Sequence, residues 1–192
     1  MKLEKNNERS GVGSWRRRMV AVLAAVAVSV GTIVAAAQPG PFGAALQQLI
    51  GAAPSGFAPI RGNAQPRNPG DESTFFDARV VVPGYTECDI EVDDEGVVSP
   101  QYSCLAYRGS AELDAMNAYQ RASSQLRDFA RGNGGRAEES TRTSNRDGIP
   151  AQYIRTRYGA PNGAAVTISY STTMYPNGRI SRLVSLAVKM GG

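Results

Sequence analysis

The sequence predicts an α+β fold of two layers, in which a mostly antiparallel sheet carries one long helix on its apolar face. Three observations support this prediction: segments in which apolar and polar residues alternate, short turns rich in Gly and Pro between them, and one stretch with helical periodicity. Short turns connect antiparallel strands, whereas parallel strands need long crossovers. The expected order in the domain is β-β-β-α-β-β-β, preceded by a signal or anchor helix and a tether.

The chain of 192 residues begins with a segment typical of export, residues 1–37. Arg16–Arg18 precede the uncharged run Met19–Ala37, which ends in small residues suited to a cleavage site. The run is longer than the usual signal core of about 7–15 residues and reaches the roughly 17–25 that span a bilayer. A cleaved signal peptide and a retained single-pass anchor therefore both stay open. Each places the rest of the chain outside the cytoplasm, in the periplasm or beyond the cell.

Residues 38–71 are interpreted as a Pro/Gly-rich tether, because residues 38–70 contain six Pro and six Gly. Within them, Phe42–Ile50 has its apolar side chains on one helical face, so a short helix lying on the membrane or on the domain is the alternative to a loose tether. Phe57–Ile60 is a second apolar patch suited to docking. The exported globular domain is expected to span residues 72–192.

Residues 86–107 are expected to form a hairpin closed by a disulfide. Residues 87–93 alternate acidic and apolar side chains, as a strand with one buried face does. A turn centred on Gly96 sets three pairs opposite each other: Cys88 and Cys104, Ile90 and Tyr102, Val92 and Pro100. In an oxidising compartment the cysteines would stay bonded, and closing a loop of about 15 residues would stabilise the fold by roughly 3 kcal/mol. Two unrelated buried thiols are the alternative.

The stretch after this hairpin predicts a helix of about 20 residues that Gly132–Gly135 terminate. Ser110 is the expected N-cap, and Glu112 lies in the first turn, where the helix dipole favours negative charge. The side chains expected to face the sheet are Leu113, Met116, Tyr119, Leu126 and Phe129.

Three strands are predicted after the helix, within Ala151–Tyr158, Ala165–Tyr175 and Ile180–Met190, while 133–149 is interpreted as a surface loop or an irregular edge strand. A three-residue loop at Pro176–Gly178 pairs apolar with apolar side chains across the last hairpin, whereas a two-residue loop would pair apolar with polar ones. The predicted pairs are Met174 with Ile180, Tyr170 with Val184 and Ile168 with Leu186.

The side chains that most enzymes use are scarce. The chain has no histidine, which excludes Ser-His-Asp catalysis, Cys-His catalysis and His-ligated metals. The two cysteines are expected to be bonded to each other, which removes thiol catalysis and Cys-ligated zinc. Lys189 is the one lysine after the export segment, and a solvated strand-end lysine is far commoner than a Ser–Lys dyad. No cofactor is expected.

Charge is distributed unevenly along the chain, although its net charge is only +4. Residues 1–37 carry +4, residues 38–120 carry −7 and residues 121–192 carry +7. The basic balance comes from the export segment, so it does not indicate a nucleic-acid partner. The acidic run of residues 89–95 contains a calcium candidate at Asp93, Asp94 and Glu95, although strand alternation explains much of the run and its spacing is not that of an EF-hand loop.

The basic counterpart is a set of arginines: Arg136, Arg142, Arg146, Arg155 and Arg157. They are either ordinary solvated charges, in part paired with the acidic hairpin, or the contact surface for an anionic partner.

Two functional hypotheses follow. The first is a non-catalytic exported binding or accessory domain whose partner is an envelope protein or another anionic envelope component, with membrane contact through residues 1–37 if these are not cleaved. The second is a hydrolase that works without histidine, using a serine or carboxylates such as Glu87 or Asp89 with Asp114. A pocket holding two carboxylates would favour the hydrolase. An exposed strand edge would favour the binding domain, because an open edge accepts a partner strand.

Overall fold

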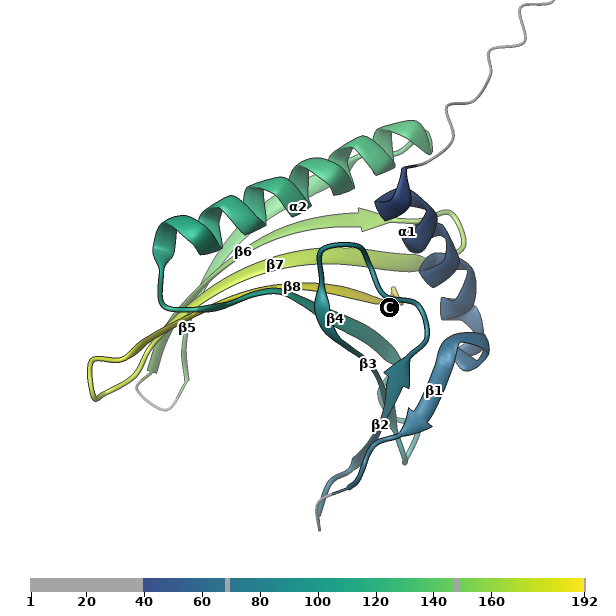
Figure 1. Cartoon of the computed structure of the whole chain (residues 1–192), viewed down its shortest axis with the longest axis horizontal. Coiled ribbons are helices and arrows are strands. Elements are labelled where there is room, and N and C mark those ends of the chain that lie inside the picture. The colour runs from purple at the N-terminus through teal and green to yellow at the C-terminus, as the bar shows by residue number, and fades with distance from the viewer. Residues whose placement is uncertain (1–39, 68–69, 147–148, 192) are drawn as a thin grey trace, which may run out of the picture. The chain divides into compact units, whose positions relative to one another are not determined.

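The computed structural model describes residues 40–67, 70–146 and 149–191 (Figure 1). The expected signal or anchor segment, residues 1–37, lies outside this part of the chain. Among the described residues, no helix combines the length and the apolar character needed to cross a membrane.

One antiparallel sheet of eight strands forms the first layer. Its strands are β1 (Arg61–Ala64), β2 (Ser73–Ala78), β3 (Thr86–Asp93), β4 (Gln101–Gly109), β5 (Ala137–Arg146), β6 (Ile149–Gly159), β7 (Ala164–Met174) and β8 (Ile180–Met190). In space they follow the order β1-β2-β3-β4-β8-β7-β6-β5, so each half of the chain forms a meander and the pairing of β4 with β8 joins the halves (Figure 1). The prediction of a mostly antiparallel sheet under a long helix is confirmed.

The sheet has two more strands than the expected order contained, one at each end. β1 lies inside the expected tether, and β5 forms where a surface loop or an irregular edge strand was expected. Neither strand carries the apolar alternation of a half-buried strand. Each lies at an edge of the sheet with one neighbouring strand, and nearly all described residues of β5 and the last two of β1 are exposed.

Two helices, α1 (Pro41–Ala52) and α2 (Glu112–Gly132), cover the same face of the sheet (Figure 1). Their buried side chains join one core with the alternate residues of the central strands, which are Tyr102, Cys104, Val166, Ile168, Tyr170, Val184, Leu186 and Val188. Small side chains on α2, at Ala115, Ala118 and Ala122, let its backbone lie close to the strands.

The start of α2 differs from the prediction in two respects. Ala111 occupies the N-cap position and no side chain caps the helix, because the helix begins one residue later than expected and leaves Ser110 outside. Leu113 is 72% exposed, although it was expected to face the sheet. It lies two positions before the buried Ala115, which is about 200° around the helix and therefore on the opposite side. Of the other predicted contacts, Tyr119, Leu126 and Phe129 are buried.

The tether interpretation does not describe residues 41–64. In α1, Leu46 and Leu49 are fully buried, and Phe57 in the following segment is fully buried against the ring of Tyr102. The high Pro and Gly content of residues 38–70 suggested a loose tether, but several of these residues begin or end short helices and turns. Pro41 occupies the first turn of α1, and Gly56 ends a 3₁₀ turn (Ala53–Ser55) at φ 61°.

Both predicted hairpin registers are confirmed. In the first, Ile90 lies opposite Tyr102 and Cys88 is bonded to Cys104, although the ladder stops at Glu91 and Gln101, one pair short of Val92 and Pro100. In the second, the three predicted pairs form, and the loop closes with Gly178 at φ 76°. The disulfide indicates that the domain matures in an oxidising compartment outside the cytoplasm.

Candidate functional site

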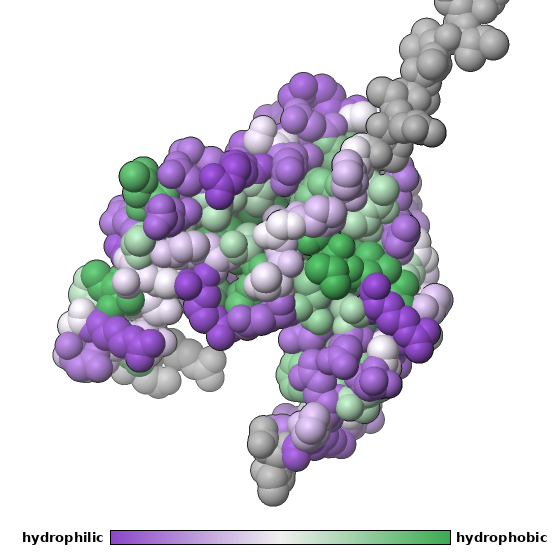
Figure 2. Space-filling model, viewed as in Figure 1, coloured by the Kyte–Doolittle hydropathy of each residue, from purple (hydrophilic) through white to green (hydrophobic). Residues whose placement is uncertain are grey.

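The face of the sheet opposite the helices is lined by small polar side chains. Thr167, Ser169 and Ser171 of β7 and Ser185 of β8 alternate with the core residues and are half-buried. Both helices that the structure describes pack on the other side, and Figure 2 shows a hollow in the molecular surface on the side away from α2. We call this surface the helix-free face.

Three of the predicted arginines, Arg142, Arg155 and Arg157, lie at one end of the helix-free face. Arg155 and Arg157 alternate along β6 with the buried Thr156, so their side chains leave the sheet on the side away from α2. Arg142 lies opposite Tyr153 on the same face, and Arg146 occupies the equivalent register position opposite Ile149. Arg136 precedes β5 and is exposed.

These arginines are not paired with the acidic hairpin. One cross-strand row runs from Arg157 through Thr167, Ala187 and Ser103 to Asp89. The ends of this row are four strand spacings apart, roughly 19 Å, which exceeds the Debye length of about 8 Å at physiological salt. Within the described residues, Arg136, Arg142, Arg155 and Arg157 have no ion pair.

Strand β5 is the free end of the sheet next to these arginines. Its ten residues, Ala137–Arg146, pair along their whole length with β6 and with no other strand of the described chain. Nearly all of its described side chains are exposed. The structure therefore presents a long, polar, unpaired strand edge beside an arginine cluster.

Two of the three acidic residues considered for calcium, Asp93 and Asp94, have partners within the described chain. The Asp93 carboxylate accepts hydrogen bonds from the backbone N–H groups of Val98 at 2.6 Å and Glu95 at 3.1 Å. These bonds hold the pKa of Asp93 below its usual value. Asp94 is paired with Arg67 and accepts a 2.8 Å hydrogen bond from Thr74. In the part of the chain that the structure describes, no three acidic or cysteine side chains come together as metal ligands.

The carboxylates considered for hydrolysis also have local partners. Glu87 forms a 3.0 Å ion pair with the exposed Arg108 on the neighbouring strand. Asp89 accepts a 2.6 Å hydrogen bond from the Ser103 hydroxyl. Neither these two residues nor Asp114 line the cavity described next.

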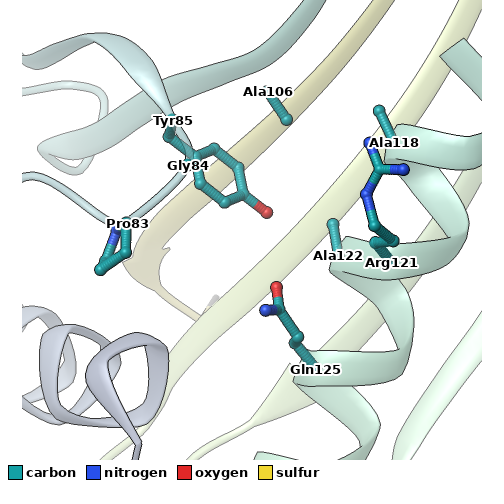
Figure 3. A pocket seen from close by; sticks show the side chains of 8 residues that line it. All are labelled: Pro83, Gly84, Tyr85, Ala106, Ala118, Arg121, Ala122 and Gln125. Carbon is teal, nitrogen blue, oxygen red and sulfur yellow. The ribbon is translucent and has the colours of Figure 1, made fainter. Parts of the chain in front are cut away.

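A cavity of about 150 Å³ lies between α2 and the segment that joins β2 to β3 (Figure 3). The residues around it are Pro83, Gly84, Tyr85, Ala106, Ala118, Arg121, Ala122 and Gln125. Sequence reasoning did not identify it. The available signal was the spacing of Ala118, Arg121, Ala122 and Gln125, which places two small and two polar side chains on one stripe of the helix.

A buried polar network ties α2 to the arginine end of the sheet. Thr156 is fully buried and donates a 3.0 Å hydrogen bond to Ser123, and its hydroxyl lies 2.9 Å from that of Tyr119. Tyr119 in turn donates to Glu139 at 3.1 Å, and Arg127 donates to the same carboxylate at 2.6 Å. Burial raises the pKa of Tyr119, so its hydroxyl remains a donor at neutral pH. This network positions β5 and β6 against the helix.

Compared with protein-family models, with curated proteins and with solved structures, the chain has no significant match in any of the three.

Proposed function

We propose that the protein is an exported binding domain that engages an acidic envelope protein through β5 and the arginines beside it. The observation that carries this proposal is the open edge of β5, a ten-residue strand at the end of the sheet. An edge of this kind has unpaired backbone donors and acceptors and can take a partner strand.

Charge supplies the selectivity in this proposal. Exposed charged residues on β5, such as Glu139 and Arg142, oppose indiscriminate edge-to-edge pairing. Arg142, Arg155 and Arg157 lie on one face with no carboxylate to neutralise them among the described residues. A partner that carries acidic groups next to its docking segment gains these contacts and associates faster.

The hydrolase alternative lacks an equivalent observation. Glu87 and Asp89 have local partners, and the cavity beside α2 is lined by one arginine and no carboxylate. Glycoside hydrolysis by two carboxylates requires both of them to flank the same bond.

The test is capture from envelope extract by the wild-type protein and by the charge-reversed variant R142E/R155E, followed by mass spectrometry of the captured proteins. We expect a component that wild type retains and the variant loses, and whose retention falls as salt is raised from about 0.05 to 0.5 M, because exposed charges are screened. The control is R131E, which reverses a highly exposed arginine on α2. Equal capture by wild type and R142E/R155E would refute the proposal.

A further inference from the structure

The Tyr85 hydroxyl lacks a hydrogen-bond partner although the residue is 93% buried, being 7% exposed. Figure 3 shows its ring pointing across the cavity toward α2, where Ala122 and Gln125 face it. Leaving a buried hydroxyl without a partner is unfavourable, and buried polar groups in proteins nearly always find one. The position of the hydroxyl indicates that the cavity receives a hydrogen-bond acceptor.

The charge of the residues around the cavity indicates which kind of hydrogen-bond acceptor the cavity binds. Arg121 lines the cavity and, within the described residues, has neither an ion pair nor a hydrogen bond. Gln125 adds an amide, and no acidic side chain contributes to the lining. Burial raises the pKa of Tyr85, so its hydroxyl stays protonated and donates. Two donors and a positive charge around one space favour an anion.

The remaining lining sets the size and character of the occupant. Pro83, Ala106, Ala118 and Ala122 present small apolar surfaces. An apolar cavity of about 150 Å³ is large enough for benzene, whereas typical drug-sized sites have volumes of about 300–1,000 Å³. A fragment with one ring or a short alkyl chain therefore matches the available space.

We propose that this cavity binds a small organic carboxylate, up to about the size of benzoate. Its carboxylate accepts hydrogen bonds from the Tyr85 hydroxyl and the Arg121 guanidinium, and its apolar part packs on Ala106, Ala118 and Ala122. The site is separate from the β5 edge, so this inference does not depend on the partner proposed above.

The probes are sodium acetate, propionate and benzoate, titrated into the ¹⁵N-labelled full-length protein at constant ionic strength and followed by NMR. We expect saturable shifts confined to the amides of residues 84–85, 106 and 118–125 with at least one of the three. Benzamide, which has the shape of benzoate without its charge, should bind at least about tenfold more weakly, since hydrogen bonds to a charged group are the stronger ones.

Three variants separate this site from a structural role. Y85F and R121Q should each weaken binding about tenfold, which corresponds to one lost hydrogen bond to a charged group. R131Q alters an exposed arginine on the same helix and should bind as wild type does. Because the Tyr85 hydroxyl has no partner in the described structure, Y85F should resist urea at least as well as wild type does.

The proposal is overturned if none of the three carboxylates gives saturable shifts, if benzamide binds as well as benzoate, or if Y85F binds with unchanged affinity. In these cases the cavity holds water or an uncharged molecule, and Tyr85 serves packing alone.

Discussion

Arg182 on β8 forms a 2.8 Å ion pair with Glu112 in the first turn of α2. The same guanidinium donates to the backbone carbonyl of Ser110, and Arg182 is only 9% exposed. The last strand in the chain, a central strand of the sheet, thus holds the start of a helix that no side chain caps. Glu112 was expected to interact with the helix dipole, and the structure adds a specific cationic partner 70 residues away in the chain.

Arg182→Met should therefore lower the free energy of unfolding by about 1–3 kcal/mol, because the Ser110 carbonyl and Glu112 lose a charged donor. Glu112→Gln should cost less than about 1 kcal/mol, since this side chain is largely exposed and its carboxylate is replaced by another acceptor. Urea denaturation of the three proteins measures both effects. Equal losses in the two variants would contradict the anchoring role of Arg182.

Reduction of the disulfide between Cys88 and Cys104 should destabilise the domain by about 3 kcal/mol, as expected for a loop of this length. Guanidinium denaturation with and without reductant measures the difference. The double variant C88A/C104A is the control, and its stability should not respond to reductant. Intact-mass analysis that finds two free thiols in the exported protein would show the bond to be absent.

Thr156→Val should lower the free energy of unfolding by about 1–3 kcal/mol, because Tyr119 and Ser123 lose a buried hydrogen-bond partner. The matched control is Thr167→Val on the neighbouring strand. Thr167 lies on the helix-free face and is half-buried, so its replacement should change stability by no more than about 0.5 kcal/mol. Indistinguishable urea midpoints for the two variants would show that the network adds no stability.

Asp93 should make the stability of the domain depend on pH. Backbone hydrogen bonds lower its pKa in the folded state, so its stabilising contribution is complete above the unfolded-state pKa of about 4 and is lost as the pH falls through the lower, folded-state pKa. Asp93→Asn should be less stable than wild type at pH 7. The difference should shrink toward zero as the pH is lowered below about 4, where the wild-type carboxyl is neutral too. If the stability difference between wild type and Asp93→Asn did not change with pH, the ionised carboxylate of Asp93 would not be a source of stability.

Local patterns explain which elements could be predicted. The register of both hairpins followed from the alternation of side chains and from turn chemistry, and Cys88, Cys104 and Gly178 are placed as those patterns require. For two segments the sequence left alternatives open, and distant contacts decide between them. Residues 41–52 become a buried helix only because the core offers a surface to Leu46 and Leu49. β5 becomes a strand through ten pairs with β6, without apolar alternation of its own.

The amino-acid sequence alone determined the oxidised cysteine pair, the two-layer class and the absence of histidine chemistry, because these depend on residue types and on spacings within one hairpin. Only the tertiary structure decided that β4 pairs with β8, that the arginines of β5 and β6 lie far from the acidic hairpin, and that Tyr85 faces Arg121 and Gln125 of α2 across a cavity. Such placements arise when segments distant in the chain pack together, and no local periodicity encodes them.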